Sequence, residues 1–242
     1  MNMDTIDAGP LRVRVLGGTD RRGGGDGPAI LLCHGFGAPG DDLVGLARGV
    51  DVGAQTRWFF PEAPLEVELG FGMKGRAWWP IDIMRYQVLA GRGDLRTLMH
   101  ETPEGLPRAR AALEECIAQL TTKYSLNHDR LILGGFSQGA MLTTELSIHA
   151  QTSYAGLVIF SGTVISMDRW RAALAQVRTP MHVMMTHGRR DALLPFAGAE
   201  LLKEMFEAAG ANVRWTAHQG GHEIPAVSLQ SFVQFTHERF GG

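Results

Sequence analysis

Short, almost unbroken apolar runs recur along this chain and are separated by longer amphipathic stretches. Ala29–Cys33 is the clearest run, and it ends at a His-Gly pair. A run of this length is typical of a strand that is buried on both faces of a parallel sheet. Leu11–Val15, where apolar residues alternate with arginines, predicts an edge strand followed by a loose, turn-rich connection. Further runs predict strands at Thr56–Phe60, Leu131–Leu133, Leu157–Phe160, His182–Met185 and, more weakly, Val213–Thr216.

The intervening stretches have the period of helices. Between Ala109 and Tyr124, apolar residues recur at steps of three and four, which places them in one stripe along a helix. Related patterns predict helices at Ser137–Ile148, Phe196–Ala209 and Ala226–Phe240. Strands that alternate with helices in this way predict an α/β fold, with a mostly parallel central sheet and helices on both faces. Ligands of such folds bind at the carboxyl ends of the strands.

One stretch, residues 65–102, breaks this alternation. It has no clear period, and it is far longer than the ~4–6 residues of a typical connection. We therefore expect a lid-like or pocket-forming insertion here. Its large apolar side chains include Phe71, Trp78, Trp79 and Met84.

Composition changes this picture little, but it excludes several classes. A chain of 242 residues, 45% hydrophobic and 20% charged, fits a single domain over residues 1–242 with a sizeable core. The 23 basic and 25 acidic residues give a formal charge of −2, so there is no basic excess for nucleic-acid binding. No apolar run approaches the ~20 residues that span a bilayer, and the first residues lack the pattern of a signal peptide. We expect a cytoplasmic protein without stable membrane insertion, and its oligomeric state is not predicted.

Candidate chemistry begins at a Gly-x-Ser-x-Gly segment formed by Gly135, Ser137 and Gly139. It follows a predicted strand directly and precedes a predicted helix directly. In this context the two glycines permit a sharp turn that lifts the serine above the sheet. The amino terminus of the helix behind the serine offers free N–H groups for an oxyanion. The sequence therefore predicts Ser137 as a nucleophile rather than an incidental turn residue.

A serine nucleophile needs a base and a carboxylate that orients the base. Asp191 follows the predicted strand at 182–185, and His222 follows the next strand, so the order Ser, Asp, His is the one that this strand-turn-helix arrangement uses. His218 is the rival base, and Asp168 is the rival acid, although its setting is typical of a helix start. For His34 and His187, we expect structural hydrogen bonding.

Acyl transfer also needs two N–H donors for an oxyanion, one after the nucleophile and one after an earlier strand. Gln138 supplies the first, and Phe36, in a glycine-flanked loop, is placed to supply the second. That loop has neither the dinucleotide glycine spacing nor a P-loop lysine, which disfavours a nucleotide site. No metal or organic cofactor is needed, and the only cysteines, Cys33 and Cys116, have no metal or redox spacing.

Together these segments resemble the phospholipase/carboxylesterase group of the α/β-hydrolase superfamily, which includes acyl-protein thioesterases. The resemblance covers most of the chain from about residue 29 onward. It implies a triad of Ser137, Asp191 and His222, with main-chain donors at Phe36 and Gln138, in agreement with the assignment from the residues. The segments that carry it are His34–Gly37, Phe60–Pro64, Gly135–Gly139, His187–Asp191 with Leu194–Pro195, and Gly221–Pro225.

The middle segment departs from this group, which usually has Trp-Phe-Asp or Trp-Tyr-Asp after a methionine. Here Ala77 is followed by Trp78, Trp79 and Pro80. We predict that Trp78 and Trp79 bind substrate in an apolar pocket above the nucleophile; the alternative is that they pack a satellite core. The acyl-chain preference of the group is not carried over.

The resemblance implies a serine esterase of the carboxylesterase or lysophospholipase kind, which cleaves small-molecule carboxylic esters or thioesters through an acyl-enzyme. Two alternatives stay open. One is a catalytically silent binding protein with the same fold. The other is a perhydrolase or lactone hydrolase that uses the same triad.

Overall fold

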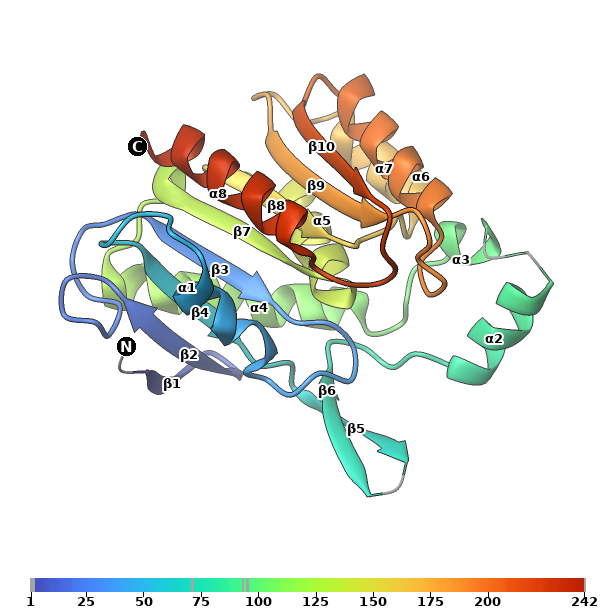
Figure 1. Cartoon of the computed structure of the whole chain (residues 1–242), viewed down its shortest axis with the longest axis horizontal. Helices are drawn as coiled ribbons and strands as arrows, with labels where there is room; N and C mark the ends of the chain where they lie inside the picture. Colours follow the sequence, from blue (N-terminus) through green and yellow to red (C-terminus); the bar gives the residue numbers. More distant parts are fainter. Residues whose placement is uncertain (1–2, 71, 93, 95, 242) are drawn as a thin grey trace.

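The computed structural model describes residues 3–70, 72–92, 94 and 96–241. Its main feature is an eight-stranded sheet of order β1-β2-β4-β3-β7-β8-β9-β10 (Figure 1). β2 pairs antiparallel with both of its neighbours, β1 and β4, and all other neighbouring strands of this sheet pair parallel. The predicted α/β fold with a mostly parallel sheet is confirmed. The strands are β1 (Asp4–Ala8), β2 (Leu11–Gly17), β3 (Ala29–Cys33), β4 (Arg57–Pro61), β7 (Leu131–Phe136), β8 (Gly156–Phe160), β9 (His182–Gly188) and β10 (Asn212–His218).

The expectation that the strand at 11–15 forms a sheet edge is wrong. β2 pairs with β1 on one side and with β4 on the other, so β1 is the edge. The sequence did not predict β1 because Asp-Thr-Ile-Asp-Ala offers only two apolar residues, of which Ile6 is half-buried and Ala8 is buried. The alternation in β2 does not come from an edge position. Its arginines point to the more open face of the sheet, and Val13 and Val15 on the other face are fully buried.

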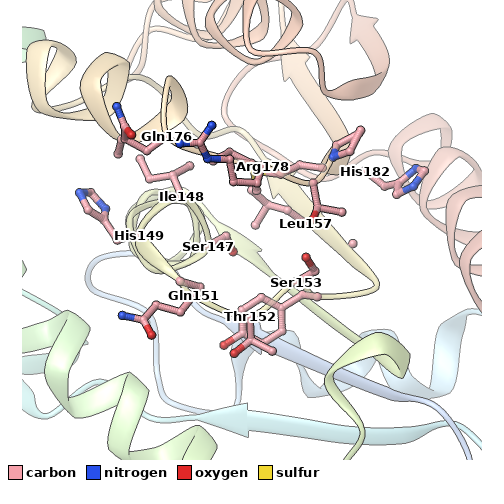
Figure 2. A pocket seen from close by; sticks show the side chains of 18 residues that line it. Ser147, Ile148, His149, Gln151, Thr152, Ser153, Leu157, Gln176, Arg178 and His182 are labelled. Atoms are coloured by element: carbon pink, nitrogen blue, oxygen red, sulfur yellow. The ribbon is translucent and has the colours of Figure 1, made fainter.

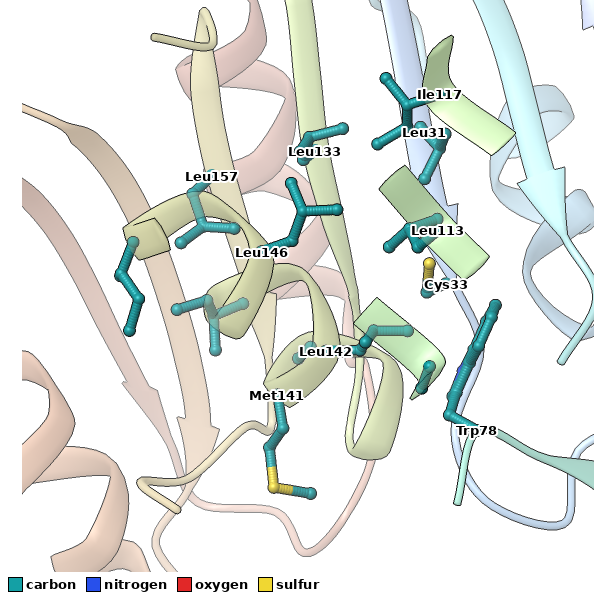
Figure 3. Close-up of a cluster of buried hydrophobic side chains, with 14 of the residues drawn as sticks. Leu31, Cys33, Trp78, Leu113, Ile117, Leu133, Met141, Leu142, Leu146 and Leu157 are labelled. Carbon is teal, nitrogen blue, oxygen red and sulfur yellow. The ribbon is translucent and has the colours of Figure 1, made fainter. Parts of the chain in front are cut away.

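Helices cover both faces of the sheet, and the alternation of strand residues explains how. In β3, Leu31 and Cys33 join one core cluster while Ile30 and Leu32 join the other, because successive strand side chains point to opposite faces. Figure 3 shows Leu31 and Cys33 facing Leu113 of α4. Figure 1 shows α8 and the short α1 on the near face of the sheet and α4 and α5 on the far face. The helices are α1 (Leu46–Gly49), α4 (Leu106–Tyr124), α5 (Gln138–His149), α6 (Met167–Leu174), α7 (Phe196–Ala208) and α8 (Ala226–Phe240), with short 3-10 turns at Asp42–Gly45 and His128–Arg130.

The segment 65–102 forms its own small elements outside the main sheet. β5 (Leu65–Gly70) and β6 (Met73–Ala77) make an antiparallel hairpin, and α2 (Ile83–Gly91) and α3 (Arg96–His100) follow. Figure 1 shows the hairpin and α2 projecting away from the layered body. Phe71, which the sequence assigned to this insertion, lies outside the described residues. Among the residues that the structure describes, no helix is long and apolar enough to cross a bilayer.

Candidate active site

Ser137 occupies a strained turn between β7 and α5. Its φ of 54° and ψ of −118° lie outside the regions that residues with a side chain normally adopt, at a cost of about 1–3 kcal/mol. A Cβ at Gly139 would lie 2.1 Å from the Cys33 carbonyl oxygen, so the turn can pack against β3 only with glycine there. Although Ser137 is the N-cap of α5, its side chain makes no capping hydrogen bond. The hydroxyl group is therefore available for chemistry.

Asp191 and His222 meet at the same edge of the sheet. Asp191 follows β9, His222 follows β10, and His222 Nδ1 lies 2.7 Å from Asp191 Oδ2. The other carboxylate oxygen, Oδ1, accepts the N–H groups of Leu193 and Leu194 at 2.9 and 2.8 Å. Because a carboxylate only accepts hydrogen bonds, the proton of neutral His222 is on Nδ1 and its lone pair is on Nε2.

Burial alone would raise the pKa of Asp191. The hydrogen bonds from His222 and the Leu194 N–H, and the electrostatic interactions with the His222 and His187 rings, outweigh burial and lower the pKa below its ordinary 3.8. Asp191 is thus an anion at neutral pH, although its side chain is fully buried. A buried anion beside Nδ1 stabilises an imidazolium, which is what a general base becomes when it takes a proton.

Ser137 is connected to this pair through the residue that precedes it. The ring of Phe136, the preceding residue, packs on the ring of His222 with centroids 4.7 Å apart. The Ser137 N–H donates to the Phe160 carbonyl oxygen at 2.9 Å, which ties the turn to the end of β8. Among the described residues, no hydrogen bond joins Ser137 to His222. In unliganded sites such bonds are often long and tighten only with substrate.

The rival residues are placed elsewhere. His218 is the last residue of β10, and its Nδ1 accepts the Gly220 N–H at 3.2 Å instead of meeting a carboxylate. Asp168 is exposed in the first turn of α6 and lies 3.4 Å from His100. The carboxylate that contacts His222 is that of Asp191.

His187 contacts the carboxylate of Asp191. The sequence predicted structural hydrogen bonding for this histidine without naming its partner. It is fully buried, and its Nε2 lies 2.7 Å from the Leu194 carbonyl oxygen and 3.3 Å from Asp191 Oδ2. Burial lowers the pKa of His187, which keeps it neutral. The four-residue separation of His187, near the end of β9, and Asp191, in the loop that follows, was the available signal for this contact.

The loop after β3 lies directly against the nucleophile. A Cβ on Gly35 would lie 3.3 Å from Ser137 Cβ. The N–H of Gly37 donates to the Arg76 carbonyl oxygen at 2.8 Å, and the Arg76 N–H donates to the Ala38 carbonyl oxygen at 3.0 Å. Within the described chain, the N–H of Phe36 has no backbone partner. The N–H of Gln138, in the first turn of α5, has no carbonyl four residues earlier within the helix to bind. The two N–H groups that the sequence predicts as oxyanion donors are therefore both free of backbone partners in the described chain.

Trp78 and Trp79 are buried, with 2% and 3% of their surfaces exposed. The Trp78 indole Nε1–H donates to the His34 carbonyl oxygen at 2.9 Å, and Figure 3 shows Trp78 beside Cys33. Both side chains belong to the main core cluster, whereas Met84 is 78% exposed. Their substrate-binding role stays a prediction, and their burial favours the packing alternative.

A cavity next to Phe36 is a better candidate for binding substrate, and the sequence did not identify it. It measures about 470 Å³ and is mostly apolar. Leu65, Val67 and Leu69 alternate with polar residues and so form one apolar face of β5, which the main sheet does not cover. This alternation was the available sequence signal for the cavity. The cavity is lined by Phe36, Val67, Glu68, Leu69, Pro80, Ile81 and Ile83.

A larger cavity, about 610 Å³, lies at the opposite end of the sheet. Figure 2 shows Ser147, Leu157 and His182 around it, and these residues come from the end of α5 and the starts of β8 and β9. Ser137, Asp191 and His222 all follow the carboxyl ends of their strands, so this cavity is separate from them. Within the described ranges, no group of three or more His, Cys, Asp or Glu side chains converges as a metal site.

Comparison with known proteins identifies the family of this chain. Residues 24–239 match the model of the phospholipase/carboxylesterase family. Acyl-protein thioesterase 1 of Schizosaccharomyces pombe is 27% identical over 168 residues, which cover 69% of each chain. The crystal structure of esterase PE8 superposes with a TM-score of 0.76 at 25% identity, covering 98% of this chain and 99% of that one. A carboxylesterase from Mesorhizobium loti shares the fold, with a TM-score of 0.73 at 18% identity over 97% and 98% of the two chains. The chain therefore belongs to the phospholipase/carboxylesterase family and is, by that membership, a carboxylic ester hydrolase.

Proposed function

We propose that this enzyme cleaves carboxylic esters or thioesters with Ser137 as nucleophile, His222 as general base and Asp191 as the group that orients the base. The observation that carries the proposal is the 2.7 Å contact between His222 Nδ1 and Asp191 Oδ2 beside the strained, uncapped serine. It fixes the tautomer that leaves Nε2 free to accept a proton. The esterase and acyl-protein thioesterase relatives support the same chemistry.

In the first step, His222 Nε2 takes the Ser137 proton while the serine oxygen attacks the carbonyl carbon. The developing oxyanion accepts hydrogen bonds from the N–H groups of Phe36 and Gln138. The imidazolium then gives its proton to the departing alcohol or thiol, and an acyl-enzyme remains. In the second step, His222 takes a proton from water, the hydroxide attacks the acyl carbon, and the acid leaves as Ser137 is reprotonated.

The cavity beside Phe36 supplies a place for an apolar part of the substrate. Its walls come from β5 and from the chain that leads into α2, so residues 65–102 act as a pocket-forming insertion in this proposal. A volume of about 470 Å³ is within the ~300–1,000 Å³ of typical small-molecule sites. We infer that an acyl chain of moderate length occupies it.

Hydrolysis of an ester series from acetyl to palmitoyl tests the proposal, with Ser137→Ala measured alongside. We expect a chain-length optimum in the wild type and a loss of about 10³-fold or more in kcat for the variant, with an unchanged fold. Hydrolysis of thioesters with the same acyl groups shows whether the rate depends on an oxygen or a sulfur leaving group. Absence of turnover together with absence of a fluorophosphonate adduct on Ser137 would contradict the proposal and favour a binding protein.

A further inference from the structure

We propose that the side chains of Gln138 and Trp78 hold the two oxyanion donors in register with each other, which makes both of them positioning residues. The inference rests on the proposed function, because it concerns the N–H groups of Phe36 and Gln138 in acyl transfer. It adds a role for an amide and an indole that touch neither the nucleophile nor the triad. It also gives Trp78 a role other than substrate binding.

The Gln138 side chain binds the main chain of the insertion at two points. The Trp78 N–H donates to Gln138 Oε1 at 2.9 Å, and Gln138 Nε2 donates to the Trp79 carbonyl oxygen at 2.8 Å. The side chain is fully buried, so these bonds have no competition from water. The residue that offers one oxyanion donor through its main chain is thus fixed, through its side chain, to a segment about 60 positions earlier.

The Trp78 indole continues this connection to the other donor. Its Nε1–H donates to the His34 carbonyl oxygen at 2.9 Å. The ring of His34 is itself held, because Nε2 accepts the Ala63 N–H at 3.1 Å and Nδ1 donates to the Gly35 carbonyl oxygen at 2.8 Å. Phe36 follows two residues after His34, so this set of buried hydrogen bonds, together with the main chain from His34 to Phe36, connects the two donors.

The far side of the same loop is anchored as well. Gly37 and Ala38 bond to the main chain of Arg76, at 2.8 and 3.0 Å. The Arg76 guanidinium lies 3.2 Å from Glu62, and Arg14 lies 2.9 Å from Glu62 while donating to the Gly40 carbonyl oxygen at 2.8 Å. Phe36 is therefore held on both sides, while its own N–H is left free of the backbone.

Position matters more for these donors than for ordinary hydrogen bonds. An oxyanion donor acts when it lies about 2.7–3.1 Å from the developing negative charge. A shift of about 1 Å at a reacting group can cost about 10²-fold in rate. Loss of a bond in this set should therefore reduce kcat, whereas a purely structural role would reduce only stability.

The test uses Trp78→Phe, which removes the indole N–H, and Gln138→Met, which removes both amide bonds but keeps the main-chain donor. We expect kcat to fall by about tenfold to a hundredfold in each, with KM for a short ester within about twofold of the wild type. A trifluoromethyl ketone, which forms a tetrahedral anion on the serine, should bind more weakly by the same factor as kcat/KM. Because both changes break one connection, the double variant should lose less than the product of the single losses.

Trp58→Phe is the matched control, since Trp58 is equally buried, at 3%, but lies in the other core cluster. It should lower the melting temperature without changing kcat. The inference is overturned if Trp78→Phe and Gln138→Met behave like this control, with wild-type kcat and ketone affinity. If the wild type shows no turnover that depends on Ser137, the proposed function is refuted instead.

A measurement on the wild type covers the case in which a variant does not fold. Exchange of the Trp78 indole proton, followed by NMR, should slow when the ketone binds, because the anion tightens the set of bonds that contains it. The Trp58 indole proton should be unaffected. Equal exchange of the Trp78 proton with and without the ketone would overturn the inference.

Discussion

The two halves of the insertion at 65–102 differ in almost every physical respect. From Gly75 to Trp79 the chain is largely buried and is hydrogen-bonded to the loop after β3 and to helix α5. By contrast, strand β5 and helix α2 project from the layered body, with Leu69, Ile83 and Met84 exposed (Figure 1). The same segment thus combines a buried, hydrogen-bonded part with an exposed apolar part. If the first supports the proposed oxyanion donors and the second lines the acyl site, the two parts should respond differently to substitution.

Gly75 offers the strongest way to disturb the anchored half. A Cβ at this position would lie 2.0 Å from the Gly37 carbonyl oxygen, a backbone atom that cannot move alone. Gly75→Ala should push the loop that carries Phe36 away from the nucleophile. We expect a loss of about 10²-fold or more in kcat/KM and of about 1–3 kcal/mol in the free energy of unfolding.

Ester hydrolysis and denaturant unfolding measure both effects. Gly49→Ala is the control, because a Cβ there meets nothing within 4 Å. It should keep full activity and lose no stability. Wild-type kcat/KM in Gly75→Ala would show that the hairpin does not position the loop.

The contrast also explains what the sequence could predict. The sharp turn at Ser137 was predictable because two glycines surround a serine between a strand and a helix. The pairing of Asp191 with His222 was predictable because each follows one of two neighbouring strands. These are local patterns on regular elements. The contact of the Trp78 indole with His34, 44 positions earlier, depends on how two loops meet, and no local pattern encodes that.

The projecting half was unpredictable for another reason. A periodic pattern of apolar residues predicts an element that has one face on a core and the other in water. β5 alternates apolar and polar residues, but most of its residues are exposed and it has no core to pack on. α2 likewise exposes apolar side chains that a core-facing pattern would bury. The sequence therefore identified the segment as unusual and could not assign its elements.

Trp79→Ala separates the packing role of this side chain from a role in binding substrate. Because Trp79 is 3% exposed within the main core cluster, its truncation should cost about 3–5 kcal/mol in the free energy of unfolding. The order of preference among acyl chains should not change. Denaturant unfolding and the ester series measure the two quantities. A changed preference at unchanged stability would instead support the predicted pocket role.

His34 should make the anchored half sensitive to acid. Burial lowers the pKa of His34 from its ordinary 6.5, and the neutral ring is needed because Nε2 accepts the Ala63 N–H. With the folded-state pKa below the unfolded one, unfolding takes up a proton, so this contribution to stability is complete above pH 6.5 and falls as the pH drops. The free energy of unfolding should decline by at most about 1.4 kcal/mol per pH unit from this group.

Denaturant unfolding between pH 7.5 and 5 checks this. His34→Gln should be less stable at neutral pH and should show a shallower decline toward acid. His237→Gln, at an exposed position on α8, should keep the wild-type slope. An identical slope in His34→Gln would show that another buried histidine, such as His187, carries the acid sensitivity.

The smallest effect on the fold is expected in the projecting half, from Leu69→Ala and Ile83→Ala. Both side chains line the cavity beside Phe36 and are largely exposed, so the free energy of unfolding should change by less than about 0.5 kcal/mol. Because each truncation removes apolar contact with an acyl chain, KM for a medium-chain ester should rise by about threefold to tenfold, while the acetyl ester is unaffected. Met3→Ala is the control, since Met3 is 41% exposed, like Leu69 at 42%, and lies beside the edge strand β1. An equal rise in KM for acetyl and medium-chain esters would show that these residues do not contact the chain, and would move the acyl site away from this cavity.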